Sequence, residues 1–319
     1  MRILFAGTPE IAAVSLRAAA ASHTVAAVLT NPDRAAGRGR GLHVSPVKAA
    51  ALELGLPALQ PEKLDAAFRD AARGLKPELL VSVAYGKIFG PRFLECFPRG
   101  GINLHPSLLP RYRGPSPINA AILNGDSETG ITIQSLALEM DAGDIILQER
   151  LSLTGKETAE SLTRSAAQRG AVLLVQALDL IAAGKENRVA QDPAGVTYCG
   201  LLDRAQGKID WKSSAAHIER MTRAFDPWPG AWTGFQGLSL RIIAAGTLSA
   251  GAADSNNKDA DGGCPGKVLG VDTREGILIQ TGDGILAVRE LQLQSKKAMD
   301  FASFLNGVRE FTGSVLGDI

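Results

Sequence analysis

The chain has 319 residues, a net charge of +1 and an apolar content of 45%. One hydrophobic core rarely serves a chain this long, so two domains are expected. The near-zero charge excludes a global attraction to nucleic acid, and any such partner would need a local basic patch. The three cysteines, Cys96, Cys199 and Cys264, show no CxxC pair and no metal-ligand spacing. This pattern predicts a reducing compartment, no disulfide framework and no metal site.

The N-terminal stretch MRILFAGTPE is typical of a first buried strand. It is too short for a secretory signal peptide. No apolar run approaches the roughly 20 residues that a transmembrane helix needs. We therefore expect a cytoplasmic protein with no membrane partner.

The first half of the chain alternates short apolar runs with helical patterns. Such unalternated runs are typical of strands covered on both faces, so the order predicts an α/β domain with a Rossmann-like, mainly parallel sheet. Ser45-Pro46 and Ser116-Pro117 each indicate a helix start, with serine as N-cap and proline at the first helical position. The expected strands are 2–6, 23–30, 78–86, 102–105 and 131–138, and the expected helices are 11–21, 46–54, 117–124 and 158–181.

The composition of the sequence changes after residue 187, where a polar stretch with several glycines begins. We assign residues 1–188 to the α/β domain, 189–206 to a linker and 207–319 to a second, smaller domain. Short strand patterns with glycine-rich turns predict a small β-barrel in the second domain. Within it, residues 246–266 contain little that could be buried, and they are expected to form a disordered surface excursion.

The glycines do not support a nucleotide site. AGTPE has one glycine where a dinucleotide fingerprint requires three in GxGxxG register. The cluster AGRGRG (36–41) is interleaved with arginine and lacks the Lys-Ser/Thr ending of a phosphate loop. The sequence thus disfavours NAD and ATP.

The stretch GINLHPSLLPRYRG (101–114) carries a candidate site. Asn103 and His105 end an apolar strand, and because they alternate with Leu104 they point to the same face. Ligands of doubly wound sheets bind at the carboxyl ends of the strands. The alternative is that both side chains only cap loop carbonyl groups.

The stretch LEMDAGDII (138–146) adds Asp141 and Asp144 after another apolar strand. The alternative here is a plain hairpin turn, in which Asp and Gly are favoured anyway. A carboxylate near His105 would orient the imidazole and favour its protonated form. Asn, His and Asp together could stabilise an oxyanion and move a proton during addition to a carbonyl.

These motifs resemble a known family. HPSLLPRYRG and MDAGD, with AGTPE, NPDRAAGRGRG and SPVK upstream, are similar to the methionyl-tRNA formyltransferases. KIDW, RAFDPWPGAW and TGDGIL are similar to the second domain of that family, so the resemblance covers nearly the whole chain. It implies transfer of a formyl group from 10-formyltetrahydrofolate to methionyl initiator tRNA, a C-terminal barrel of the oligonucleotide-binding (OB) type, and no metal. We expect the protein to act as a monomer.

The resemblance also implies site residues. The catalytic residues would be Asn103, His105 and Asp141. Folate contacts would be Ser107, Leu108, Leu109, Pro110, Tyr85, Gly86 and Asp144. Contacts to tRNA would be Arg34, Arg38, Arg40 and Lys48 in the basic loop 31–48, with Lys208 and Arg241 in the second domain. Arginines that alternate with glycine can reach phosphates or stack on bases.

Several alternatives stay open. The basic loop has four basic residues against one acid, Asp33, and could be only a solvated surface. A related folate enzyme could formylate a sugar-nucleotide amine or hydrolyse the donor, but it would not need the arginine loop. A non-catalytic RNA-binding protein would not need the Asn-His-Asp set. Trp228 and Trp232 could stack on bases, although a buried packing role is expected for both.

Overall fold

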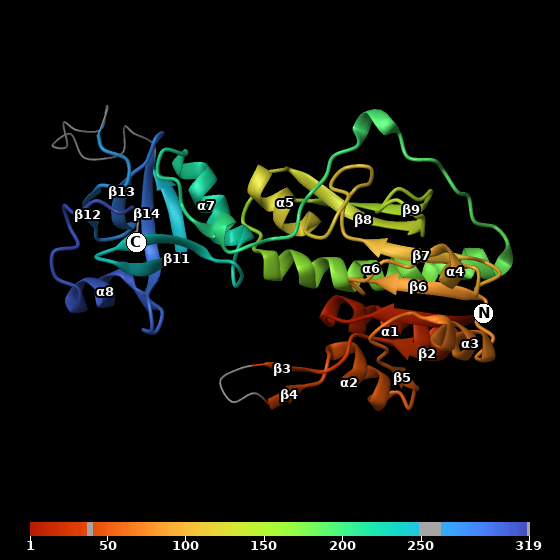
Figure 1. Ribbon diagram of the computed structural model, residues 1–319. Helices are drawn as coiled ribbons and strands as arrows, with labels where there is room; N and C mark the ends of the chain where they lie inside the picture. The colour runs from red at the N-terminus through yellow and green to blue at the C-terminus, as the bar shows by residue number, and fades with distance from the viewer. Residues whose placement is uncertain (37–40, 249–262, 318–319) are drawn as a thin grey trace. The chain divides into compact units, whose positions relative to one another are not determined.

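The computed structural model describes residues 1–36, 41–248 and 263–317 (Figure 1). The chain forms two compact units. The first consists of Met1–Pro117, Ser127–Leu153 and Ser161–Gly200, and the second of Ile118–Asp126, Thr154–Glu160 and Leu201–Ile319. Arg38, Arg40 and most of the excursion predicted at 246–266 lie outside the described residues.

The first unit is built on a seven-stranded sheet with the order β5-β2-β1-β6-β7-β8-β9. Neighbours are parallel from β5 to β7, whereas β8 and β9 are antiparallel, which confirms the mainly parallel sheet. In chain order, the strands are β1 Arg2–Gly7, β2 Thr24–Leu29, β5 Ala58–Leu59, β6 Leu79–Val83, β7 Gly101–His105, β8 Glu128–Ser135 and β9 Ile145–Ser152.

Helices accompany this sheet, as its apolar strands require. Those of the first unit are α1 Glu10–Ser22, α2 Pro46–Glu53, α3 Ala66–Gly74, α4 Pro91–Leu94 and α6 Ala159–Ala183. The Ser45 hydroxyl accepts a bond from the Lys48 N–H, so the predicted N-cap of α2 is confirmed. By length and composition α6 could cross a membrane, the one such helix among the described residues. Its face from Leu162 to Ile181 is buried, however, as in the core helix of a soluble protein.

The described part of the basic loop forms a hairpin. β3 Arg34–Ala36 pairs antiparallel with β4 Gly41–His43. At its base, the carboxylate of Asp33 forms an ion pair with Lys48 and accepts a bond from Gln60. Backbone pairing therefore joins β3 to β4, and the contacts of Asp33 fix the base of the hairpin.

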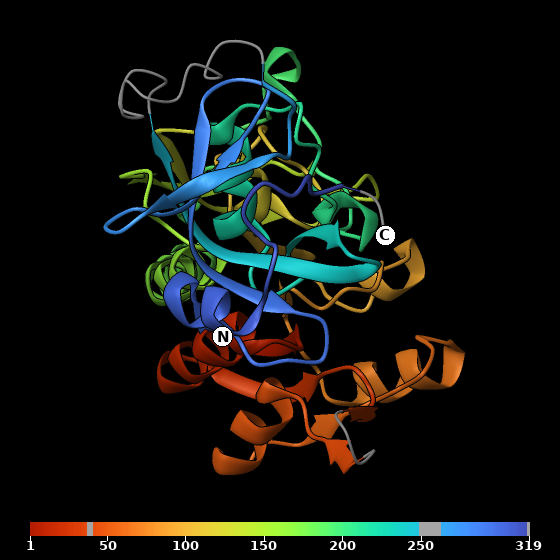
Figure 2. The same cartoon turned by 90° about the vertical axis from the view of Figure 1, so that its left-hand side faces the viewer.

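The second unit is an antiparallel sheet with the order β10-β11-β14-β13-β12 (Figure 2). C-terminal residues bridge both edge strands: Gly317 pairs with Gly234 of β10, and the Val268 N–H of β12 donates to Ser314. This connection closes the sheet in the manner of the predicted barrel. The elements are α5 Pro117–Asn124, α7 Ala215–Ala224, β10 Ala231–Phe235, β11 Leu238–Leu248, β12 Val268–Asp272, β13 Gly276–Gln280, β14 Ile285–Leu293, β15 Met299–Asp300 and α8 Phe301–Gly307.

Two expectations differ from the structure. Residues 189–200, predicted as a linker, belong to the first compact unit and are hydrogen-bonded to it, for instance at Val189 and Ile145. A polar segment without periodicity looks like a linker in sequence, but its backbone finds partners on the folded unit. The packing role expected for Trp228 is wrong, because this side chain is 57% exposed. Trp232 is partly buried and donates to the Arg204 carbonyl.

Candidate active site

Asn103 and His105 share one face of β7. Between them, Leu104 points toward α6, and its Cδ1 lies 2.9 Å from the position that a Cβ on Gly170 would occupy. Asn103 and His105 therefore point to the opposite face, as the alternation predicted. On the parallel neighbour β6, Ser82 pairs with Asn103 and Leu80 with Gly101, so these residues share that face.

The carboxylate of Asp141 brings the predicted catalytic residues together. Asn103 Nδ2 donates to Oδ1 at 3.3 Å, and His105 Nδ1 lies 3.6 Å from Oδ2. Gln134 Nε2 also donates to Oδ1, and the Gly114 N–H to Oδ2, both at 2.9 Å. The His105 and Asp141 side chains are 5% and 13% exposed. These donors, rather than bulk water, stabilise the carboxylate charge.

The second ring nitrogen of His105 is also engaged. Nε2 lies 2.8 Å from the carbonyl oxygen of Tyr112. A carbonyl can only accept, so Nε2 carries a proton and donates. Because Nδ1 faces a carboxylate, a doubly protonated ring can serve both partners, whereas a neutral ring can serve only one. The geometry thus places a protonated Nε2 on the Tyr112 carbonyl and leaves Nδ1 facing the Asp141 carboxylate.

Asp141 lies in the connection between the antiparallel strands β8 and β9, so the expected turn is present, and its carboxylate faces Asn103 and His105. Its φ is +51°, in the left-handed region. Two residues on, a Cβ at Gly143 would lie 1.8 Å from the Ser135 carbonyl oxygen, so only glycine fits. The turn residues that are common in hairpins therefore also direct the carboxylate back toward β7.

Gln134 is a site residue that sequence reasoning missed. It lies directly opposite Asn103 in the antiparallel β7–β8 pair. Facing residues of such a pair point to the same side of the sheet, so both amides reach the same carboxylate oxygen. The signal is visible only once the strand register is known, because the two residues lie far apart in the chain.

The predicted folate loop Ser107–Pro110 is fixed by Thr132. The Thr132 hydroxyl donates to the Ser107 carbonyl at 2.7 Å and accepts from the Leu109 N–H at 3.2 Å. It also accepts from Gln148 Nε2 at 2.9 Å, which satisfies its one donor and two acceptor sites. The loop backbone is thereby tied to β8.

The side chains of this loop differ in access. Ser107 is fully buried and donates to the Arg111 carbonyl, and Leu109 is 3% exposed. Leu108 and Pro110 are partly buried. A ligand could therefore reach Leu108 and Pro110 more readily than the Ser107 hydroxyl.

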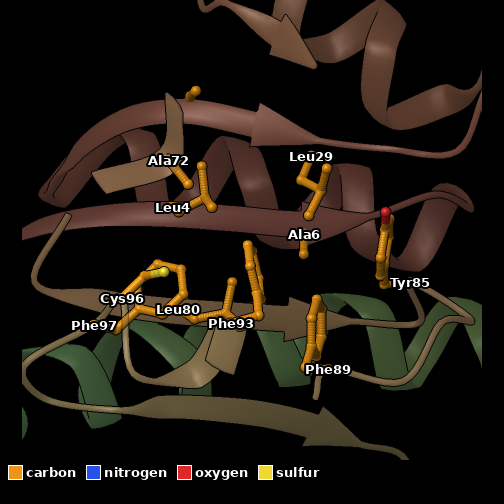
Figure 3. Close-up of a cluster of buried hydrophobic side chains, with 11 residues drawn as sticks. Leu4, Ala6, Leu29, Ala72, Leu80, Tyr85, Phe89, Phe93, Cys96 and Phe97 are labelled. Carbon is orange, nitrogen blue, oxygen red and sulfur yellow. The ribbon is translucent and has the colours of Figure 1, made fainter. Parts of the chain in front are cut away.

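The remaining predicted folate residues are dispersed. The Tyr85 ring is 2% exposed and stacks on Phe89 within an apolar cluster (Figure 3). It therefore belongs to the core, and Tyr85 can offer a ligand only its backbone. Gly86 is exposed and has a φ of +81°. Asp144 is exposed, and its carbonyl accepts the Ser135 N–H.

Four of the predicted tRNA contacts lie in the part of the chain that the structure describes, namely Arg34, Lys48, Lys208 and Arg241. Arg34 is placed only by its backbone in β3, and Lys208 is exposed. Lys48 and Arg241 are each paired with an acid, Asp33 and Asp226, which reduces the charge they can offer to phosphate. Hydrogen bonds from Lys48 and then Gln60 hold the pKa of Asp33 below its usual value. Within the described residues, no group of three or more His, Cys, Asp or Glu side chains could hold a metal.

The fold and the candidate site indicate a class of protein, and comparisons with known proteins identify the family. Residues 1–178 match the family model described as "Formyl transferase", and residues 201–309 match "Formyl transferase, C-terminal domain". A "Methionyl-tRNA formyltransferase" of Treponema denticola is 44% identical over 98% of both chains. One of Roseiflexus castenholzii is 45% identical over 99% of both chains.

Among solved structures, the N-formyltransferase of Helicobacter canadensis in complex with folinic acid and dTDP-3-aminofucose has a TM-score of 0.64 at 20% identity. The match covers 90% of this chain and 98% of that one, and it shows a shared fold. The chain therefore belongs to the formyl transferase family, and within it to the methionyl-tRNA formyltransferases.

Proposed function

We propose that this chain transfers the formyl group of 10-formyltetrahydrofolate to the amino group of methionyl initiator tRNA. The observation that carries the proposal is the single carboxylate of Asp141, which Asn103 contacts and which His105 faces at 3.6 Å. The names of the relatives support methionyl-tRNA as the formyl acceptor. The folinic acid of the Helicobacter canadensis structure, together with the sequence motifs, supports a folate donor. The reaction serves translation initiation, and we propose a monomeric cytoplasmic enzyme.

In the proposed mechanism, the unprotonated amine attacks the formyl carbon. Asn103 Nδ2, with the hydrogen that does not face Asp141, and the positive charge of a His105 imidazolium stabilise the oxyanion that forms. Collapse of the intermediate breaks the bond between the formyl carbon and folate N10. The amine loses a proton and N10 gains one, and Asp141 assists this transfer through water. Both nucleophile and leaving group come from substrates, so no covalent enzyme intermediate is needed.

We propose that the folate is bound at the loop Ser107–Pro110. We further propose contacts to Gly86 and the Tyr85 backbone, which follow β6, and to Asp144, which precedes β9. The bonds of Thr132 and Gln148 to this loop support a preformed surface. The Helicobacter canadensis structure, which has the same fold, is described with folinic acid. The tRNA would be bound by Arg34, Arg38, Arg40, Lys48, Lys208 and Arg241.

The direct test is transfer of a labelled formyl group from 10-formyltetrahydrofolate to methionyl initiator tRNA. Uncharged tRNA and a sugar-nucleotide amine serve as controls. We expect label only on the charged tRNA. Faster labelling of the sugar-nucleotide amine, or hydrolysis of the donor without transfer, would contradict the proposal and favour one of the two related folate reactions.

The arginine loop has its own test. If Arg38 neutralises a phosphate, tRNA affinity should fall with salt, and Arg38→Ala should reduce the slope of log affinity against log salt by about 1. Arg150→Ala is the control, because it removes an exposed arginine on β9 that is paired with Glu128. Equal slopes for both variants would speak against a phosphate contact at Arg38.

A further inference from the structure

A segment outside both family matches lies against the site. The matches end at residue 178 and resume at residue 201. Between them, Thr197 and Cys199 bond to the backbone of Arg113. The segment thus lies beside the loop that carries Gly114, one of the donors to the Asp141 carboxylate.

Gln191 is the residue of this segment with the most contacts to the Asp141 turn. Its Nε2 donates to the carbonyl oxygens of Asp141 at 2.8 Å and Gly143 at 2.7 Å. Nε2 also lies 3.3 Å from Oε1 of Gln134. An amide nitrogen has two hydrogens, so the two shorter contacts use them. Gln191 therefore holds the backbone on both sides of the turn that presents the carboxylate.

The orientation of the Gln191 amide is fixed by Arg113. Oε1 of Gln191 accepts from Arg113 Nε at 3.0 Å and Nη2 at 2.9 Å. A guanidinium can only donate, so the amide oxygen must face it and the nitrogen must face the carbonyls. Arg113 is 7% exposed, and its neighbour Gly114 donates to Asp141 Oδ2. The Gln191 side chain thus connects Arg113, which precedes Gly114, with the carbonyl groups of the Asp141 turn.

We propose that Gln191 is a positioning residue that fixes the Asp141 carboxylate relative to Asn103 and His105, and this rests on the function proposed above. Asp141 has a left-handed backbone, which costs energy in a non-glycine residue and persists only when its surroundings hold it. Gln191 holds this residue by its own carbonyl. Small displacements of catalytic groups are costly, about a hundredfold for 1 Å.

The first test is the steady-state kinetics of Gln191→Ala. We expect kcat for formyl transfer to fall about ten- to a hundredfold, with both KM values changed less than about twofold. Gln191→Glu should be equally impaired, because it keeps the acceptor for Arg113 but loses the donors to the carbonyls. The control is Asp192→Ala, which removes the carboxylate that accepts a hydrogen bond from the Ala194 N–H in the same segment. Normal kcat in Gln191→Ala would overturn the proposal.

A double-mutant cycle separates positioning from general stability. If Gln191 acts through Asp141, then Gln191→Ala should cost less than about twofold in an Asp141→Asn background. A structural role alone would give the same loss in both backgrounds, together with a lower melting temperature. That additive outcome would overturn the positioning role.

Hydrogen exchange gives a readout that needs no activity. The Gly114 N–H donates to Asp141 Oδ2, so its exchange should accelerate at least about tenfold in Gln191→Ala and stay unchanged in Asp192→Ala. Unchanged exchange in Gln191→Ala would overturn the proposal. If the unsubstituted chain did not formylate methionyl-tRNA, the proposed function would fail, while this measurement would still decide whether Gln191 positions Asp141.

Discussion

The carboxyl ends of β6 and β7 are neighbours on the same face of one sheet, yet they have opposite chemistry. Beside β7, the carboxylate of Asp141, from the connection between β8 and β9, is contacted by side-chain and backbone donors. After β6, the Tyr85 hydroxyl is buried and has no hydrogen-bond partner among the described residues. Both ends were expected to contribute residues to a ligand site. Only at β7 do polar side chains of a facing strand, Gln134 and Thr132 of β8, lie opposite the candidate residues.

The difference shows which polar groups can be buried without a hydrogen-bond partner. Burying a large apolar side chain contributes about 1.5–3 kcal/mol. An unsatisfied buried hydroxyl costs about 1–3 kcal/mol. For Tyr85 the two are comparable, so the ring can enter the cluster without a partner for its hydroxyl. A carboxylate has no such option, because an unpaired buried charge costs far more.

The largest expected effect follows from Asn103→Ala. It removes one of the two groups proposed to hold the oxyanion, and such losses typically reduce kcat by about a hundredfold or more. The fold should persist, because the Asn103 amide donates one long bond of 3.3 Å to Asp141. Single-turnover formyl transfer and thermal unfolding measure the two properties. Turnover near that of the unsubstituted chain would remove Asn103 from the mechanism.

A second prediction concerns two threonines of β8. Thr132→Val leaves the Ser107 carbonyl and the Leu109 N–H without their partner, so the free energy of unfolding should fall by about 2 kcal/mol. Thr129→Val is the matched control. The Thr129 hydroxyl is buried without a partner among the described residues, so its loss should be neutral or stabilising.

Urea unfolding of both variants gives the comparison. Equal destabilisation would show that the bonds of Thr132 do not hold the folate loop. In that case KM for 10-formyltetrahydrofolate should also remain unchanged. A preformed loop instead requires that this KM rise in Thr132→Val and not in Thr129→Val.

Tyr85→Phe tests the apolar region. Burial raises the pKa of Tyr85 to about 12 from its ordinary 10.0. The folded state therefore retains the proton longer than the unfolded chain, so stability is full below pH 10 and is lost as pH rises toward 12. Each pKa unit corresponds to about 1.4 kcal/mol. Between pH 9 and pH 11, Tyr85→Phe should lose about 1 kcal/mol less stability than the unsubstituted chain.

The same variant should be at least as stable at pH 8, because it removes only an unpaired hydroxyl. Urea unfolding at the three pH values is sufficient. A marked loss of stability at pH 8 would mean that the hydroxyl has a partner, such as an ordered water molecule.

Sequence reasoning reached as far as local patterns extend. Apolar runs and the Ser45 N-cap predicted the alternation of strands and helices along the chain, and the alternation of side chains placed Asn103 and His105 on one face. Gln134 and Thr132 depend on the register of β7 and β8, which no local pattern encodes. Gln191 lies in a segment without periodicity, and the contacts of its side chain with the Asp141 turn are visible only in the folded unit.

Charge patterns in the sequence show how many basic residues a segment carries, but not which acceptors those side chains contact. Arg220 and Arg223 of α7 could be counted as part of a basic surface. In the structure, Arg220 donates to the Leu123 carbonyl, and Arg223 donates to Glu219 and to the Glu157 carbonyl. Pairing with nearby acceptors is a tertiary property, and for the same reason Asp33 forms an ion pair with Lys48, far from it in the chain.

The smallest expected effect is on the alkylation rates of two cysteines, Cys96 in the apolar cluster and Cys199 near Asp141. Cys96 belongs to the apolar cluster, where burial raises the pKa of its thiol. Cys199 lies beside Tyr112 and Arg113, and its pKa is raised first by burial and also by the charge of Asp141. Because only the thiolate reacts, iodoacetamide at pH 7.5 should alkylate exposed Cys264 before either of them.

Asp141→Asn then distinguishes the two regions. Removing the negative charge should lower the pKa of Cys199 and raise its alkylation rate severalfold, because more thiolate is present at a given pH. Asp141 is not among the groups that shift the pKa of Cys96, where the nearby acids are Asp70 and Glu95, so its rate should not change. Peptide mass spectrometry follows each thiol separately. Equal acceleration at both would mean that the substitution loosens the whole unit, and that the Asp141 charge does not act locally.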